Sequence, residues 1–193
     1  LGANGEPQKW HPTSSNTGDW VYWYADTALG SARSTFSAVA YNNRMYIVGG
    51  LTTSSTLLTS NTVQYAQINP TGTLGAFTAT GMQAITSGTG RYGHTVQMYN
   101  DNMYIIGGAN TYGGSPLTTV EYSKLNNDGT MNTWTATSSL SGSGRLTYGG
   151  SFSTIWGAYI YVAGGCTAHG SGSCSTITDE VQLASINADG SVA

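Results

Sequence analysis

Three arginines stand at matching places along the chain, and each precedes an apolar run that ends in two glycines: Arg33, Arg91 and Arg145. A guanidinium group can hold a carboxylate through two parallel hydrogen bonds. Three such groups around one opening would form a crown that binds carboxylates or acidic peptide segments. The alternative is structural, with each arginine tying its part of the chain to the next through backbone carbonyls. Because a ligand rarely needs a side chain from every copy of a repeat, the strict recurrence favours the structural role.

The densest aromatic cluster of the chain consists of Trp20, Tyr22, Trp23 and Tyr24. Alternate residues of an extended strand face the same side, which would place Trp20, Tyr22 and Tyr24 together. Flat rings with a polar edge suit sugars or a protein partner. The cluster is therefore the best candidate for ligand binding, and the alternative is an additional strand or flap that packs on the rest of the fold.

Two cysteines, Cys166 and Cys174, are separated by small and polar residues. This spacing makes a local disulfide easy to form, and a disulfide would indicate an oxidising compartment. The alternative is a pair of free or metal-binding thiols, with His169 between them as a further zinc ligand. A fourth ligand is missing nearby and the cysteine spacing is not usual for zinc, so we expect the disulfide.

Other groups that could carry catalysis are few and scattered. His94 stands where the other repeats have Phe36 and Tyr148, so we expect it to pack at the start of a strand. Asp179 and Glu180 are the only adjacent carboxylates, and no phosphate-binding loop, serine-nucleophile motif or zinc-protease motif occurs. The sequence therefore predicts a protein that is not an enzyme and that uses no cofactor or metal.

The composition limits the possible partners. Only 8% of the 193 residues are charged and the formal net charge is -3, whereas a typical soluble domain has about 25% charged residues. Solubility must come from serine, threonine, asparagine and glycine, as is common in secreted and cell-surface β proteins. No basic stripe is present to neutralise phosphates, which argues against nucleic acid. No apolar run approaches the roughly 20 residues of a membrane span.

The chain repeats itself, and the repeat sets the expected architecture. Pairs of glycines end apolar runs at three places: Gly49 with Gly50, Gly107 with Gly108, and Gly164 with Gly165. Each copy offers short runs rich in β-branched and aromatic residues with turn signals between them, and no segment holds a helical apolar period. Repetition at this period indicates an array of one small unit.

The repeat boundaries follow from these markers. We expect an outer strand and an aromatic insertion in residues 1–32, four-stranded units in 33–90 and 91–144, and a unit without its last strand in 145–193. The expected strands of the cleanest copy are 94–99, 103–106, 120–125 and 133–137. Three polar segments, 51–61, 109–117 and 166–178, are expected to be loops on one common face, where repeat proteins of this kind usually bind ligands.

These features resemble the kelch-type β-propeller family. The matching residues are the second strand with its glycine pair, as in Tyr104 to Gly108, the preceding arginine, and a later aromatic, Phe77 or Trp134. The chain is most similar to the kelch-like repeat regions of large bacterial surface and secreted proteins. The resemblance implies an all-β, kelch-like β-propeller with three visible four-stranded blades. Propellers have typically about four to eight blades, so the remaining blades would come from a longer chain or from a second copy.

The expected function is a non-catalytic recognition or adhesion module, extracellular or at the cell surface, that binds glycan or protein through the propeller loops. One alternative is a structural building block of a fibre or surface layer. Another is a fragment of a secreted propeller enzyme whose catalytic residues lie elsewhere.

Overall fold

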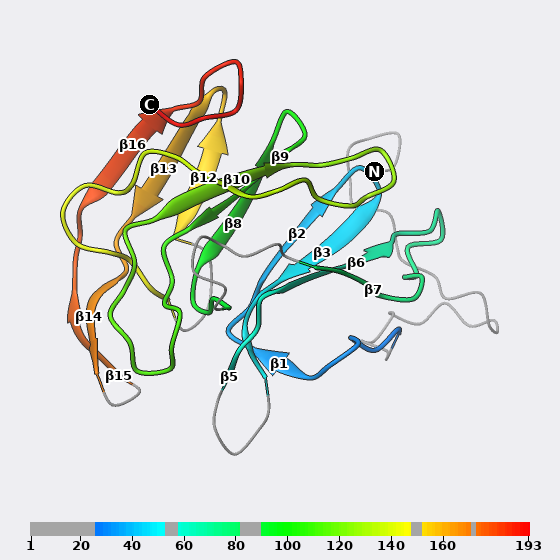
Figure 1. Cartoon of the computed structure of the whole chain (residues 1–193), viewed down its shortest axis with the longest axis horizontal. Helices are drawn as coiled ribbons and strands as arrows, with labels where there is room; N and C mark the ends of the chain where they lie inside the picture. The colour runs from blue at the N-terminus through cyan, green and yellow to red at the C-terminus, as the bar shows by residue number, and fades with distance from the viewer. Residues whose placement is uncertain (1–25, 53–57, 82–89, 148–151, 171–172) are drawn as a thin grey trace, which may run out of the picture.

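The computed structural model describes residues 26–52, 58–81, 90–147, 152–170 and 173–193, and in these residues the chain forms strands joined by turns and loops (Figure 1). Three antiparallel sheets, which we call blades 1 to 3, follow one another along the chain. Two smaller sheets lie in the connections.

Blade 1 has the strand order β2-β3-β6-β7. Its strands are Ser37–Tyr41 (β2), Arg44–Val48 (β3), Thr62–Gln67 (β6) and Thr78–Gly81 (β7). Asn42 and Asn43 join β2 to β3 and have φ values of 46° and 55°. Asparagine tolerates this left-handed backbone, which a tight two-residue hairpin requires.

Blade 2 repeats the pattern as β8-β9-β10-β11. Its strands are Thr95–Tyr99 (β8), Asn102–Ile106 (β9), Val120–Lys124 (β10) and Thr135–Ala136 (β11). Blade 3 contains only β12-β13-β16 among the described residues. These strands are Ser153–Trp156 (β12), Tyr159–Ala163 (β13) and Val181–Ser185 (β16). The strands of blade 2 lie within one or two residues of the ranges expected for the cleanest copy.

The first strands of the blades lie beside one another, so the blades fan out from them (Figure 1). The Val96 N–H donates to Ser37 Oγ at 3.1 Å, and Ser153 Oγ donates to Thr95 Oγ1 at 3.0 Å. Apolar residues fill the space between neighbouring blades. One cluster lies between blades 1 and 2: Tyr46, Val48, Val63, Val96, Met103, Ile105, Leu125 and Trp134. Another lies between blades 2 and 3: Tyr104, Ile106, Val120, Phe152, Ile160, Val162, Ile186 and Val192.

The glycine pairs let consecutive blades touch through their backbones. The Gly50 N–H donates to the Arg91 carbonyl at 2.8 Å, and the Gly108 N–H donates to the Arg145 carbonyl at 2.6 Å. A Cβ on Gly107 would lie 2.4 Å from that Arg145 oxygen, closer than any real contact. The recurring glycines are therefore needed where one blade meets the next.

Two of the segments expected to be loops contain short strands. Residues 51–61 contribute Leu51–Thr52 (β4) and Leu58–Thr59 (β5), which form a small sheet with Arg33–Ser34 (β1). Residues 166–178 form a hairpin of Cys166–Gly170 (β14) and Ser173–Ile177 (β15). Serine, threonine and glycine are frequent in these segments. The sequence therefore shows no alternation of apolar and polar residues from which these strands could be predicted.

Candidate recognition face

The segments that follow the glycine pairs form one surface, which we call the loop face. It consists of the described parts of residues 51–61, 109–117 and 166–178. Thr59 Oγ1 of blade 1 donates to the Asn110 carbonyl of blade 2 at 3.0 Å. His169 Nδ1 of blade 3 lies 3.2 Å from the Gly114 carbonyl of blade 2 and donates to it. The loop of each blade is thus fixed to the next, and the face is continuous across all three blades.

A small apolar cluster supports the loop face from below: Leu51, Tyr92, Ala109, Leu146 and Cys166. Tyr92 of this cluster is fully buried. Its hydroxyl accepts a hydrogen bond from the Gly113 N–H at 3.3 Å, and its ring centroid lies 6.3 Å from that of Tyr112 and 6.5 Å from that of His169. Burial raises the pKa of the Tyr92 hydroxyl above its ordinary value. The cluster holds the aromatic part of the face in place.

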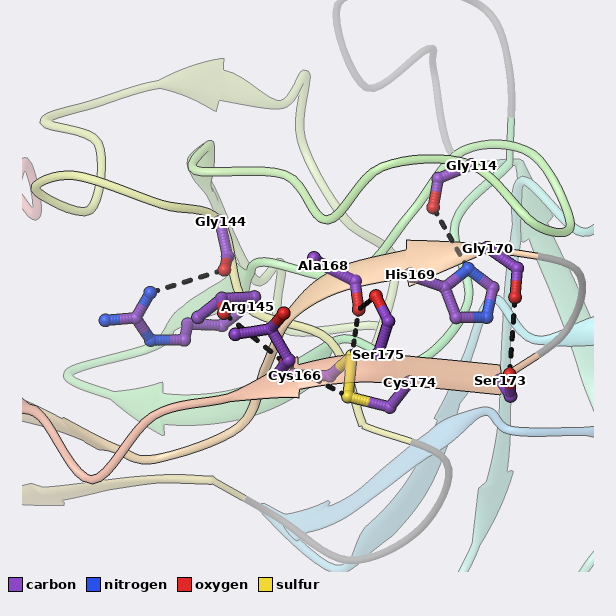
Figure 2. The surroundings of a disulfide bond; sticks show 12 residues. Gly114, Gly144, Arg145, Cys166, Ala168, His169, Gly170, Ser173, Cys174 and Ser175 are labelled. Atoms are coloured by element: carbon purple, nitrogen blue, oxygen red, sulfur yellow. Dashed lines mark hydrogen bonds between the residues drawn. A yellow bond between two sulfur atoms is a disulfide. The ribbon is translucent and has the colours of Figure 1, made fainter.

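A disulfide joins Cys166 to Cys174 and closes the β14–β15 hairpin, with Cα atoms 5.8 Å apart (Figure 2). The expected disulfide is therefore present, and both sulfurs are engaged in it instead of binding zinc. Ser175 Oγ donates to the Ala168 carbonyl at 3.0 Å across the same hairpin. His169 points from this hairpin toward Gly114 of the neighbouring loop (Figure 2). Because the closed loop is short, we expect the disulfide to contribute near the lower end of about 2–4 kcal/mol.

The loop face carries no formal charge. Residues 51–61, 109–117 and 166–178 contain no Asp, Glu, Lys or Arg. Large apolar side chains nevertheless reach the surface there, with Tyr112 46% exposed and Leu58 and Ile177 more so. Hydroxyls, backbone amides and one flat ring suit a neutral ligand better than a phosphate or a carboxylate.

Arg91 and Arg145 are buried inside their own blades. The Arg91 guanidinium donates to the Gly107 carbonyl at 3.1 Å and to Glu121 Oε1 at 2.9 Å. The Arg145 guanidinium donates to the Ser143 carbonyl and pairs with Glu180. Burial lowers the pKa of Arg91 and the charge of Glu121 opposes this effect. Both guanidinium groups are thus occupied, which favours the structural alternative over a crown that binds a ligand.

Arg33 lies in the equivalent place in blade 1 and is partly buried. It donates to the Gly49 carbonyl at 2.9 Å and to Ser31 Oγ at 2.9 Å. The contact between blades differs from the one expected, because the backbones of Arg91 and Arg145 make it and not their guanidinium groups. For example, the Arg91 N–H donates to the Ser60 carbonyl of blade 1 at 3.1 Å.

The aromatic cluster of Trp20, Tyr22, Trp23 and Tyr24 lies outside the described residues. Sequence reasoning missed Tyr92, Tyr112 and the strands of the β14–β15 hairpin. One signal in the sequence could have indicated Tyr92. A large apolar residue directly follows the recurring arginine in two repeats, Tyr92 after Arg91 and the buried Leu146 after Arg145.

His94 packs at the start of β8, as expected, and is buried. Its ring faces Gly49, as the ring of Phe152 faces Gly107. The equivalent residue of blade 3 is therefore Phe152 and not Tyr148, because the additional residues of that copy precede β12. Among the described residues, no group of three or more His, Cys, Asp or Glu could hold a metal ion.

Burial and the nearby Arg91 charge lower the pKa of His94 from its ordinary 6.5 to about 3. Between these values the unfolded chain binds a proton that the folded chain does not. We therefore expect the free energy of unfolding to be fully retained above pH 6.5 and to fall as the pH drops toward 3, by up to about 1.4 kcal/mol per pH unit. Urea unfolding at several pH values measures this slope. The His94→Phe variant should lose this part of the slope, and an unchanged slope would contradict the assignment.

Comparison with solved structures identifies the fold. No protein-family model matches the chain, and neither does any curated protein. Among solved structures, YjhT, a kelch-repeat β-propeller protein, superimposes with a TM-score of 0.63 at 19% sequence identity. The match covers 89% of this chain and 48% of YjhT, so the chain spans about half the length of that protein. The chain is thus an all-β protein with a kelch-like β-propeller fold. Within the described residues, no helix is long and apolar enough to cross a membrane.

Proposed function

We propose that this chain is a non-catalytic recognition or adhesion module of a bacterial surface or secreted protein, which binds a neutral glycan or a protein through the loop face. The observation that carries the proposal is a continuous face without formal charge, with Tyr112 exposed within it. Hydrogen bonds between loops pre-organise this face, which reduces the entropy lost on binding. The aromatic cluster at Trp20 to Tyr24 is a second candidate for contact with the same ligand.

An extracellular location is part of this proposal. The Cys166–Cys174 disulfide fits an oxidising compartment, and the low content of charged residues fits a secreted β protein. Nucleic acid is not among the proposed partners, because the loop face lacks the cations that would neutralise phosphates.

The first test is binding of the labelled full chain to an array of neutral, acidic and sulfated glycans. We expect binding to neutral glycans that does not change with salt, because no charge on the face is available for screening. Tyr112→Ala should weaken binding about tenfold, equivalent to about 1.4 kcal/mol, whereas Tyr112→Phe keeps the ring and should bind nearly as well as the wild type. Circular dichroism confirms that both variants fold.

The other arms of this test separate the alternatives. If Trp20→Ala and Trp23→Ala abolish binding and Tyr112→Ala does not, the aromatic cluster and not the loop face is the binding site. Binding restricted to acidic or sulfated glycans, with a strong salt dependence, would contradict a neutral recognition face. Turnover by the purified chain would support the enzyme alternative instead.

The building-block alternative also has a specific observation in its favour. Several of the exposed large apolar side chains lie on blade 3 rather than on the loop face: Trp156, Tyr159, Val181 and Leu183. Such a surface is typical of a contact with further protein.

A further inference from the structure

We propose that the Cys166–Cys174 disulfide is a redox switch for the loop face, and that His169 transmits its state to the blade 2 loop that carries Tyr112. Reduction by a dithiol releases His169 from that loop while the three blades stay folded. Regulation of ligand binding rests on the proposed function, whereas the loosening of the blade 2 loop can be measured without any ligand.

The outer strand of the β14–β15 hairpin has little besides the disulfide to hold it in place. Among the described residues, β15 pairs with no strand other than β14, and a hairpin of two strands is marginally stable at best in water. Four of the five residues of β15 are exposed, and the fifth is Cys174. Cys174 packs against the apolar cluster under the loop face. The disulfide is therefore the main anchor of β15.

The same disulfide fixes the position of His169. Cys174 lies directly opposite His169 in the hairpin. The register of the two strands shifts on both sides of Ala168, the residue just before His169, so backbone pairing alone holds the histidine weakly. Cys166, at the other end of the disulfide, is well anchored, because its N–H and carbonyl both bond to the backbone of Leu146 at 2.9 and 3.0 Å. The histidine is thus tied to a fixed strand through a covalent bond that can be broken by reduction.

His169 connects the hairpin to the residues next to Tyr112. Its Nδ1 donates to the Gly114 carbonyl at 3.2 Å (Figure 2). Its ring lies edge-on to that of Tyr92, with centroids 6.5 Å apart, and the Tyr92 hydroxyl accepts a hydrogen bond from the Gly113 N–H. These contacts hold the two residues that directly follow Tyr112. Loss of His169 from this place would therefore loosen the exposed ring of the loop face.

A reductant can reach the disulfide from the side of β15. Cys166 is only 5% exposed, whereas Cys174 is partly exposed. One thiolate of a small dithiol attacks Cys174 Sγ, the bond between the two cysteine sulfurs breaks, and its electron pair leaves on Cys166 Sγ, which takes up a proton. The second thiolate of the dithiol then displaces Cys174, which also takes up a proton, and closes a disulfide in the reductant. The chain is left with two thiols.

We expect the blades to stay folded after this reaction. Their interfaces consist of the two large apolar clusters and of backbone contacts at the glycine pairs, such as Gly108 with Arg145. None of these contacts includes a cysteine. The hydrogen bonds between Cys166 and Leu146 do not use the sulfur, so the base of the hairpin also stays attached.

Hydrogen–deuterium exchange of the full chain with and without dithiothreitol, in the absence of glycan, tests the switch. The N–H groups of Gly113 and Gly114 are both hydrogen-bonded in the oxidised chain. We expect peptides that contain them to exchange about tenfold faster after reduction, because local opening becomes more frequent. Peptides that contain Ser60 are the internal control, since its N–H bonds to Gly50 within blade 1. Titration of free thiols establishes that reduction is complete.

Two sets of variants separate the contact of His169 from a general loosening. The double variant Cys166→Ala with Cys174→Ala should exchange like the reduced chain, and dithiothreitol should not change it. His169→Ala keeps the disulfide, so residues 109–117 should exchange as in the reduced chain while β14 and β15 stay protected. His169→Asn places a donor near the position of Nδ1 and should restore most of the protection in 109–117.

The oxidised and reduced chains are also compared on the array of neutral glycans. If the reduced loop holds the binding arrangement in about one molecule in ten, the apparent dissociation constant rises about tenfold. Equal binding in the two states would overturn the regulation of the site.

The exchange data decide the switch independently of the glycans. Unchanged exchange at Gly113 and Gly114 after complete reduction would overturn the proposal. So would a loss of protection throughout the blades, since the disulfide would then support the whole fold. Faster exchange confined to the loop and the hairpin, with no glycan bound in either state, would support the switch and contradict the proposed function instead.

Discussion

Replacing Gly107 by alanine should lower the free energy of unfolding by roughly 3 kcal/mol or more, which combines a left-handed backbone cost of about 1–2 kcal/mol with a steric clash. Gly107 has a φ of 65°, and its new Cβ would lie 2.4 Å from the Arg145 carbonyl oxygen of the next blade. That oxygen accepts the Gly108 hydrogen bond, so the clash would force blades 2 and 3 apart. Urea unfolding of the purified variant measures the loss.

Gly142 provides the matched control for this prediction. Its φ is 68°, and a Cβ there meets no atom within 4 Å. Gly142→Ala should therefore cost only the backbone part. Equal losses at Gly107 and Gly142 would show that the clash between blades contributes nothing, and would contradict the role given to the glycine pairs.

Removing the carboxylate of Glu121 should cost about 3–5 kcal/mol, because it leaves a buried guanidinium without its partner. The side chains of Arg91 and Glu121 are 3% and 2% exposed, and their nearest atoms are 2.9 Å apart. Thermal or urea unfolding of Glu121→Gln measures the effect. The double variant Arg91→Met with Glu121→Leu should recover much of the loss, since no charge is then left without a partner.

Glu180→Gln is the control for the ion pair. Glu180 pairs with Arg145, but its side chain is 51% exposed. The Arg145 guanidinium is itself buried, with its side chain 1% exposed, but water can reach it in place of this half-exposed carboxylate. We therefore expect a smaller loss than for Glu121→Gln. Similar losses for Glu121→Gln and Glu180→Gln would contradict the assignment of the Arg91 pair as the buried one.

The blades could be predicted from the sequence because local signals and the repeat agree. The glycine pair marks the end of each second strand, and Asn42 and Asn43 supply the positive φ that the first hairpin needs. The sequence does not show why each second strand must end in two glycines. This requirement depends on the approach of the next arginine's backbone, a contact between residues far apart in the chain.

The loop face was harder to predict. The strands β14 and β15 consist mostly of small and hydroxyl-bearing residues, so they carry no apolar alternation, although the disulfide that closes them was expected. Arg91 can be buried because its guanidinium pairs with Glu121 on β10. The pairing of β9 with β10 places Glu121 within reach of Arg91, and the sequence alone does not show this pairing. Recurrence alone favours a structural role for the arginines over a ligand-binding crown, but it does not tell whether each charge faces a channel or a carboxylate.

The most direct test of the proposed recognition face is hydrogen–deuterium exchange of the full chain with and without a neutral glycan that binds on the array. We predict slower exchange within residues 109–117 and 166–178, since Tyr112 and the disulfide-closed hairpin belong to these segments. Protection that spares all three segments of the loop face would contradict the account, and protection confined to the segment around Trp20 and Trp23 would move the site to the aromatic cluster.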